Sequence, residues 1–457
     1  MYNAYAPCGM QTHHTITVSC NFKPTLKKHS EIFLFGAGAI SDWNGPTTYE
    51  LTNLIRQSGF PVKSSNMKIT EFIYQKLCDS GYEEDEINFE TIINVIEELA
   101  IYYSDSGLEK KTPSLLRAFL NDDNLDDIFN FSIKNGIREH NYKLNIPKDI
   151  EYKHGRSSLN GENPKQFFLQ HLLSVIITNI NARISKYAYH TKGNSVIEQN
   201  SDESVLLKNW LRKKEIENHI RLYTLNYDRV FKILLQDIGI DCFEGFEIDE
   251  EVFYHYGLRA NVPKILNEFN CNVHYNLHGS SFWKVIPRND NQLTSPEIVY
   301  SGTPEFPLSE EHANLQMEKG KPVYLTNIIT GYQKAQKTII TPFKQMNAAF
   351  DIDCCNANKI TIIGYSFGDE HINESIKTAL RFNKQIKIEI VSPNFIKKKM
   401  DEKLILTLFQ YLDNRNYNPK KVSENKFSYF NDQIIVYTLG FIEYLEQEKA
   451  AANNVYI

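Results

Sequence analysis

The sequence predicts an α/β fold, a Rossmann-like parallel sheet with a large all-helical insertion lobe. The wholly apolar run at residues 32–35 ends at a glycine-rich turn, which is typical of a buried central strand of a parallel sheet. Strand-like and helical segments alternate again from residue 221 onward, as in βαβ architectures. Between about residues 65 and 220, apolar residues recur at helical intervals, so this stretch is expected to be an all-helical insertion.

Local signals predict the first elements. Residues 1–30 show no clear period and are expected to form an N-terminal arm, with a single strand at 15–18. Beyond the glycine-rich turn, Thr47 and Glu50 have the spacing of a capping box, and apolar residues follow at helical intervals. A helix is therefore expected to begin here, and we interpret Thr47 as a capping residue rather than as a ligand contact.

The insertion is expected to contain two amphipathic helices, after which the sheet resumes. Apolar residues from Phe89 to Tyr103 mark one helix, and those from Phe168 to Ile180 mark the other. The Asn- and Lys-rich stretch 413–426 is expected to be a loop. Further strands are predicted at 221–224, 338–340, 360–363, 386–391 and 433–438.

The overall charge gives no reason to expect direct binding to nucleic acid. The 457 residues include 50 Lys and Arg against 56 Asp and Glu, a formal net charge of −6. Two short basic runs, 212–214 and 397–399, are interpreted as solvated faces, with contact to a phosphate backbone as the alternative. A chain of this length can bury a large core, and two lobes are expected.

Cysteine usage and hydropathy indicate a soluble, cytoplasmic protein. The seven cysteines are scattered and show no C-x-x-C spacing, which argues against a disulfide framework and against a structural zinc site. No apolar run reaches the roughly 18–20 residues of a membrane span, and the first 30 residues are polar, unlike a secretory signal peptide.

Four short motifs, in a fixed order and each placed after a strand-like run, carry the chemistry. A glycine loop lets backbone amides approach a phosphate, while an Asn/Asp pair and a histidine at strand ends can hold and split a nicotinamide dinucleotide. The motifs are Gly36-Ala37-Gly38-Ala39, Thr224-Leu225-Asn226-Tyr227-Asp228, Leu277-His278-Gly279-Ser280 and Ile363-Gly364-Tyr365-Ser366.

This ordered set resembles the sirtuin-like proteins, and within them the zinc-free branch of bacterial NAD hydrolases that act in antiphage defence. The resemblance spans residues 31–395, which it implies to be an NAD-binding catalytic domain, with the helical insertion at about 65–220. Residues 396–457 are then expected to be a C-terminal extension. NAD is implied as the substrate, and no metal is expected.

The resemblance implies that the glycine turns hold the dinucleotide. Gly36, Ala37 and Gly38 are implied to lie under the pyrophosphate, although the two glycines alternatively serve only to permit a tight turn. The adenosine half is implied to contact Gly364, Ser366 and Ser392. Ser366 is alternatively only a turn residue.

The catalytic residues implied by the resemblance are Asn226 and His278. Asn226 would bind the nicotinamide ribose and orient water without placing a charge beside a developing oxocarbenium ion, and His278 would be the base facing the ribose. A lone histidine before a glycine is, taken by itself, more often structural. Asp228 either shapes the nicotinamide pocket or caps the helix that begins near Val230. His274 lies four residues before His278, a spacing that would place both on one face of a helix. This segment is instead expected to be the end of a strand, so a His/His metal pair is discounted.

Two departures from the sirtuin pattern bear on the reaction. Deacylating sirtuins carry a four-cysteine zinc module after the histidine motif, whereas only Cys354 and Cys355 follow His278 in this chain. Thr47 stands where those enzymes carry the aspartate of a Pro-Asp-Phe-Arg motif. Without the zinc lobe, water is the expected acceptor rather than an acyl-lysine peptide.

The sequence therefore predicts an NAD hydrolase that yields nicotinamide and ADP-ribose, acting as an abortive-infection effector that depletes cellular NAD when activated. The alternatives are a zinc-free deacylase or ADP-ribosyltransferase, and a non-catalytic module that senses NAD or ADP-ribose. Because fewer than about 60 residues follow residue 400, control is expected from homo-oligomerisation or from a second protein. The resemblance suggests a HerA-type ATPase or a short Argonaute as that partner.

Overall fold

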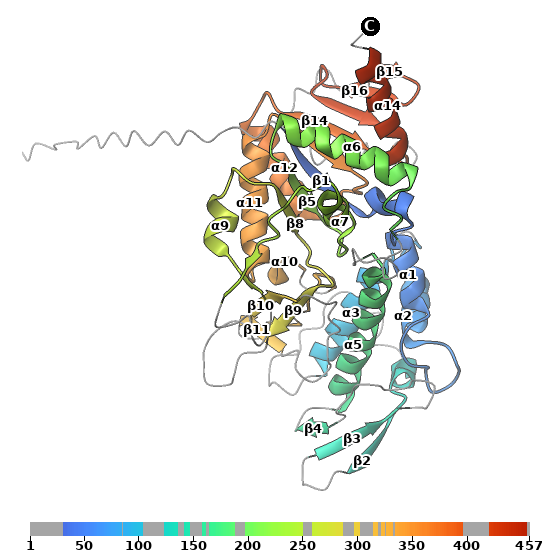
Figure 1. Cartoon of the computed structure of the whole chain (residues 1–457). Helices are drawn as coiled ribbons and strands as arrows, with labels where there is room; N and C mark the ends of the chain where they lie inside the picture. Colours follow the sequence, from blue (N-terminus) through green and yellow to red (C-terminus); the bar gives the residue numbers. More distant parts are fainter. Residues whose placement is uncertain are drawn as a thin grey trace, which may run out of the picture.

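The central feature of the computed structural model is an eight-stranded, mostly parallel sheet that confirms the predicted fold class (Figure 1). The strand order is β15-β16-β17-β14-β13-β1-β5-β8. The structure describes residues 31–84, 86–103, 123–135, 141–146, 158–160, 164–187, 197–249, 258–286, 297–301, 314–318, 321–324, 326–331, 334–395 and 420–454. The N-terminal arm with its expected strand, and the basic run 397–399, lie outside these residues.

Six neighbouring strands of this sheet run parallel, so their carboxyl ends meet at one edge. They are β1 (Glu31–Phe35), β5 (Arg221–Thr224), β8 (Val273–Asn276), β13 (Lys359–Ile363), β14 (Lys387–Val391) and β17 (Ile434–Tyr437). The two antiparallel strands at the other end of the sheet are β15 (Lys420–Ser423) and β16 (Lys426–Tyr429).

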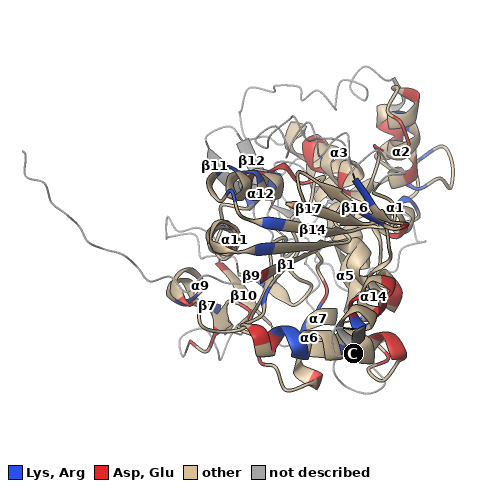
Figure 2. Ribbon diagram, turned by 90° about the horizontal axis from the view of Figure 1, so that it is seen from above, with Lys and Arg blue, Asp and Glu red and all other residues tan. Residues whose placement is uncertain are grey.

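Both faces of the sheet are covered by helices, which explains why β1 is apolar from Ile32 to Phe35 (Figure 2). Phe33 and Phe35 point to the face covered by α6 (Asp202–Glu217), α7 (Val230–Asp237) and α14 (Phe441–Asn454). Ile32 and Leu34 point to the face covered by α11 (Phe343–Asn356) and α12 (Glu370–Phe382). A separate apolar core therefore lies against each face of the sheet.

A third apolar core lies in the lobe that is inserted after β1. Its helices are α1 (Thr48–Arg56), α2 (Ile69–Asp79), α3 (Phe89–Tyr102) and α5 (Pro164–Ser185). The lobe also contains an antiparallel sheet of three short strands, β2 (Ser132–Asn135), β3 (Asn141–Asn145) and β4 (Ser158–Asn160), which helical periodicity did not predict. Helix α6 falls within the predicted insertion 65–220, but it packs on the main sheet.

The predicted capping box is present at the start of α1. The Glu50 amide donates to Thr47 Oγ1 at 3.3 Å, and the Thr47 amide donates to Glu50 Oε2 at 2.8 Å. The helices predicted from Phe89 and around Phe168 are α3 and α5. These three segments carry their own start signals or a strong period, so they could be predicted from sequence.

Two predictions for the second half of the chain were wrong. Residues 338–340 form no strand, because they join α10 (Lys334–Lys337) to α11 and leave the Ile339 side chain 54% exposed. The expected loop 413–426 contains β15 and the start of β16. The strand predicted at 433–438 is confirmed as β17, which pairs in parallel with β14, so part of the expected extension 396–457 belongs to the main sheet.

The remaining elements lie near the β8 side of the sheet and in short connections. A four-stranded sheet contains β6 (Phe246–Glu247), β7 (Leu258–Ala260), β9 (Trp283–Ile286) and β10 (Glu297–Tyr300). The other elements are η1 (Ala37–Trp43), η2 (Asp123–Ile128), α9 (Val262–Asn267), β11 (Asn314–Glu318) and β12 (Lys321–Tyr324). Among all described helices, none has both the length and the apolarity to cross a membrane.

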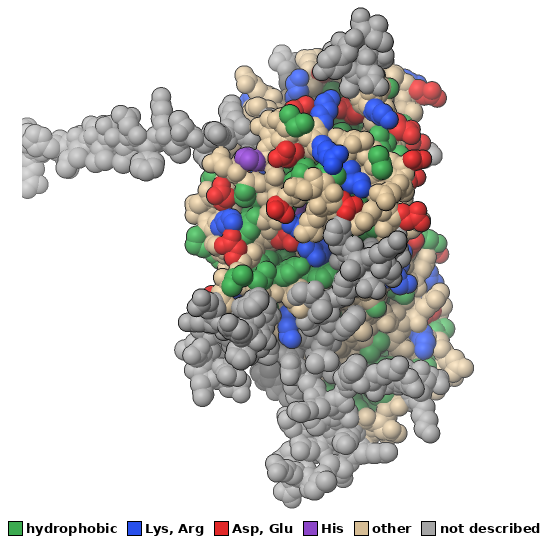
Figure 3. Space-filling model, in the orientation of Figure 1, with side chains coloured by type: hydrophobic (Ala, Val, Ile, Leu, Met, Phe, Trp, Pro, Cys, Tyr) green, Lys and Arg blue, Asp and Glu red, His purple; other side chains and the backbone are tan. Residues whose placement is uncertain are grey.

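Charged side chains of both signs are interspersed on the described part of the face drawn in Figure 3. Within the basic run 212–214, Arg212 and Lys213 are exposed, while the Lys214 ammonium pairs with Glu31 at 2.6 Å. One of the three cations of this run is therefore already paired, as expected of a solvated helix face rather than of a phosphate-binding stripe.

Candidate active site

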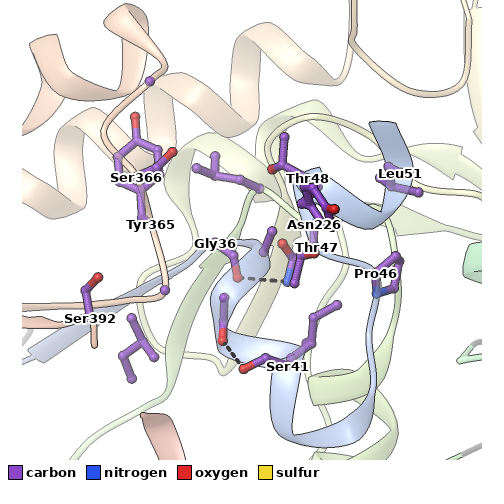
Figure 4. A pocket seen from close by; sticks show the side chains of 18 of the residues that line it. Gly36, Ser41, Pro46, Thr47, Thr48, Leu51, Asn226, Tyr365, Ser366 and Ser392 are labelled. Atoms are coloured by element: carbon purple, nitrogen blue, oxygen red, sulfur yellow. Dashed lines mark hydrogen bonds between the residues drawn. The ribbon is translucent and has the colours of Figure 1, made fainter. Parts of the chain in front are cut away.

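A cavity of about 650 Å³ lies at the carboxyl edge of the parallel sheet (Figure 4). Five of its lining residues follow five neighbouring strands: Gly36, Gly364 and Ser392 come directly after β1, β13 and β14, and Asn226 and His278 come two positions after the ends of β5 and β8. The volume is within the range of about 300–1,000 Å³ that is usual for ligand pockets. Open α/β sheets bind their ligands at this edge.

All nine residues that the sequence singled out line this cavity. They are Gly36, Ala37, Gly38, Asn226, Asp228, His278, Gly364, Ser366 and Ser392. They come together because each motif follows a parallel strand, and these strands end at one edge. Their proposed roles toward a ligand remain predictions.

The glycine turn after β1 is in direct contact with the turn after β13. The Gly36 amide donates to the Ile363 carbonyl and the Gly38 amide donates to the Gly364 carbonyl, both at 2.9 Å. A Cβ on Gly36 would lie 2.6 Å from the Gly364 oxygen, and Gly364 has a φ of +63°. The alternative role of these glycines, permitting a tight turn, is thus visible in the structure.

Asn226 is held rigidly in the cavity wall. Its side-chain amide donates to the Gly36 carbonyl at 3.1 Å, which is the dashed contact beside Gly36 in Figure 4. Its backbone amide donates to Thr224 Oγ1 at 3.0 Å, and its carbonyl accepts from Asn276 Nδ2 at 2.8 Å. The carboxamide therefore keeps one orientation, which suits a group that must position a ligand or a water molecule.

Asp228 contacts the start of α7 and also lines the cavity, while its role toward a nicotinamide stays a prediction. Its Oδ1 accepts a hydrogen bond of 2.9 Å from the Val230 amide at the start of α7, and the residue also lines the cavity. Burial raises the pKa of this carboxyl to about 6, although the hydrogen bond from Val230 acts in the opposite direction. The carboxyl is thus partly protonated in weakly acidic solution.

His278 is buried at the end of β8 and faces the cavity. Gly279 follows with a φ of +89°, and a Cβ there would lie 2.3 Å from the Asn327 carbonyl oxygen, so the turn requires glycine. Burial, assisted by the nearby Lys334 ammonium, lowers the pKa of His278 well below its usual range. The imidazole is therefore neutral near pH 7 and can act as a base.

Four residues that the sequence did not single out surround His278. His371 Nε2 lies 3.2 Å from His278 Nε2, and Asp369 Oδ1 lies 4.0 Å from the same atom. The Lys334 ammonium bridges Asp369 Oδ1, at 2.5 Å, and Glu90 Oε1, at 3.0 Å. Burial alone would raise the pKa of Asp369, but His278 and Lys334 outweigh it and lower this pKa to about 2.

Within the described residues, His278, Asp369 and His371 form the one group of His, Cys, Asp or Glu side chains spaced so that a metal ion could be held. Their candidate ligand atoms all lie within 4.8 Å of one another. The Lys334 ammonium already binds the Asp369 oxygen that a cation would need. This arrangement favours an ion pair beside two imidazoles over a bound metal ion. The expectation of a zinc-free protein stays a prediction.

Comparisons of the sequence with protein-family models and with curated proteins found no match. The sirtuin-like resemblance therefore depends on the ordered motifs, and its functional consequences remain hypotheses.

The contact between the two glycine turns predicts that Gly364→Ala destabilises the protein. The new Cβ would lie 2.2 Å from the Ala39 amide nitrogen, at a φ that side chains disfavour. We expect a loss of several kcal/mol in the free energy of unfolding, measured by urea titration. Gly368→Ala is the matched control, because its nearest neighbour would be Ser366 Oγ at 3.7 Å. Equal losses in both variants would contradict this interpretation.

Burial of Asp228 predicts that Asp228→Asn stabilises the protein in a pH-dependent way. The folded-state pKa of about 6 lies above the ordinary value of 3.8, so the wild type loses stability as pH rises through 6. Asparagine keeps an oxygen for the Val230 amide and carries no charge. We expect the gain in melting temperature to be larger at pH 7.5 than at pH 4.5, with at most about 3 kcal/mol involved. A gain that is independent of pH would refute the assignment.

Proposed function

We propose that the protein is an NAD hydrolase that cleaves the bond between nicotinamide and ribose. The observation that carries the proposal is the convergence of a rigid carboxamide, Asn226, and a buried neutral imidazole, His278, on one part of a cavity that glycine turns also line. Such a pair can orient a water molecule and accept its proton as the water attacks a ribosyl cation, without placing a permanent positive charge beside that cation.

The order of the strands gives the cavity a length that suits a dinucleotide. Along the sheet edge, the lining residues appear in the order Ser392, Gly364, Gly36, Asn226 and His278. Four strand spacings of about 4.8 Å separate the two ends, so the row extends over roughly 19 Å. An extended NAD molecule could place its adenosine near Ser366 and Ser392 and its nicotinamide ribose near Asn226 and His278.

In the proposed reaction, the bond between the ribose C1′ and the nicotinamide nitrogen breaks, and its electron pair leaves with nicotinamide. Asn226 holds the ribose and orients a water molecule toward C1′. His278 accepts a proton from that water as the new C–O bond forms, which gives ADP-ribose. One well-placed base of this kind contributes about 10²–10⁴-fold to the rate.

Water is the proposed acceptor because the described residues offer no frame for a zinc-dependent peptide cleft. Cys354 is fully buried in α11, where burial raises the pKa of its thiol, and Cys355 is its chain neighbour. These two cysteines are therefore part of a helix that packs on the sheet. A zinc-free deacylase or an ADP-ribosyltransferase is the second candidate, since either would use the same ribosyl cation.

The physiological part of the proposal depends on the sequence resemblance alone. We infer a cytoplasmic effector of antiphage defence that depletes NAD when activated. Its control would come from homo-oligomerisation or from a partner such as a HerA-type ATPase or a short Argonaute.

The direct test is to incubate the purified protein with NAD and separate the products by chromatography. Wild-type protein should release equal amounts of nicotinamide and ADP-ribose. His278→Ala and Asn226→Ala should lower turnover about 10²–10⁴-fold, because each removes a group that acts on the reacting ribose. His219→Ala is the matched control, since that histidine is exposed and does not line the cavity.

The products also discriminate between the candidates. Nicotinamide that forms only when an acyl-lysine peptide is added would indicate a deacylase, and ADP-ribose bound to protein would indicate a transferase. Binding of NAD without any nicotinamide release would indicate a sensing module. Retention of more than about a tenth of wild-type turnover in His278→Ala would contradict its role as the base.

A further inference from the structure

The imidazole of His278 lies next to a second imidazole, that of His371. The Nε2 atoms of His278 and His371 are 3.2 Å apart, which is a hydrogen-bond distance, and the two rings are tilted by 41°. His278 lines the cavity, whereas His371 is not among the lining residues. His371 belongs to the first turn of α12 and is partly exposed. The pair thus connects the cavity with a less buried position.

The hydrogen bond determines which nitrogen of His278 faces a ligand. Two neutral imidazoles can share only one proton between their Nε2 atoms, so one ring donates and the other accepts. Because Nε2 of His278 is engaged by His371, Nδ1 is the nitrogen that remains for the substrate. A basic Nδ1 requires that His278 carries its proton on Nε2 and donates it to His371.

Burial and the Lys334 ammonium lower the pKa of both imidazoles, and the Asp369 carboxylate is the neighbouring group that favours an additional proton on the pair. Lys334 contributes one positive charge, while Asp369 and Glu90 each contribute a negative charge, so this cluster has a net charge of −1. Asp369 Oδ1 is 4.0 Å from His278 Nε2, close enough to stabilise an imidazolium there. Among described elements, the charged groups facing the pair come from α3, α10 and α12.

We propose that His371 is a positioning residue that fixes the tautomer of His278 and receives its proton during turnover. This inference depends on the proposed function of the same cavity. When Nδ1 of His278 accepts the proton of the attacking water, the proton on Nε2 moves to Nε2 of His371. His278 is then neutral with its proton on Nδ1, and His371 carries the charge. After the products leave, Nδ1 of His278 releases its proton to water in the cavity and His371 returns a proton to Nε2 of His278, which restores the starting tautomers. No oxidant, metal or further reactant takes part in this transfer.

The test uses two variants of the full-length chain with complementary properties. In His371→Gln, the carboxamide can still accept the hydrogen bond from His278, but it cannot take up a proton. We expect turnover to fall about 10- to 100-fold, while KM and the tautomer of His278 stay unchanged. In His371→Ala, both the turnover and the single tautomer should be lost. Glu370→Gln is the matched control on α12, because Glu370 is exposed and pairs with Lys377.

The tautomers can be measured without any turnover, by nitrogen NMR on protein labelled with ¹⁵N-histidine and assigned through the variants. The inference predicts a protonated Nε2 on His278, an unprotonated Nε2 on His371, and a scalar coupling between the two nitrogens. Absence of that coupling, or turnover of His371→Gln within twofold of the wild type, would overturn it. If wild-type protein releases no nicotinamide, the proposed function fails and the relay with it, whereas the NMR spectrum still decides whether the two rings are paired.

Discussion

The close contact between two glycine turns is the constraint on which the rest of the site depends. The turns after β1 and β13 approach so closely that the Gly38 amide donates directly to the Gly364 carbonyl at 2.9 Å. A Cβ at Gly36, Gly38 or Gly364 would lie within 3 Å of the opposite backbone. In the same turn, the Gly36 carbonyl accepts a hydrogen bond from the Asn226 side chain.

Buried charges attach the helical lobe to this edge. Glu90 at the start of α3 and Asp369 beside α12 share the Lys334 ammonium, and Glu97 of α3 pairs with the buried Lys337 at 2.7 Å. The Glu97–Lys337 pair is buried, and losing one partner of such a pair leaves a desolvated charge, which costs about 3–5 kcal/mol. The lobe therefore contributes Glu90 to the surroundings of His278 in a defined position, and the site is composed of both lobe and sheet.

The part of the site that could be predicted from sequence is the part that follows parallel strands. Asn226 and His278 come two positions after the ends of β5 and β8, so the strand-like runs before them already predicted that they lie together. Asp369 and His371 were within reach too, because they follow the turn at Gly364 by a few residues. The motif at Gly364 ends at Ser366, so it did not include these two residues.

The residues that could not be predicted depend on contacts between distant segments. Glu90 and Lys334 are 244 positions apart, and no local pattern relates them. Residues 439–441 line the cavity because β17 joins the main sheet beside β14. A strand was predicted at 433–438, but its sequence does not show which strand it pairs with. The three-stranded sheet of the lobe was missed for a related reason, since its strands are three to five residues long and largely polar.

The central claim is that this cavity binds NAD with its nicotinamide ribose between Asn226 and His278. A crystal structure of the His278→Ala variant with NAD tests it most directly, because this variant should bind the dinucleotide without cleaving it. We predict that the ribose C1′ lies beside the Asn226 carboxamide and that the adenosine extends toward Ser366 and Ser392. An NAD molecule bound in the reverse direction or outside this cavity would contradict the claim.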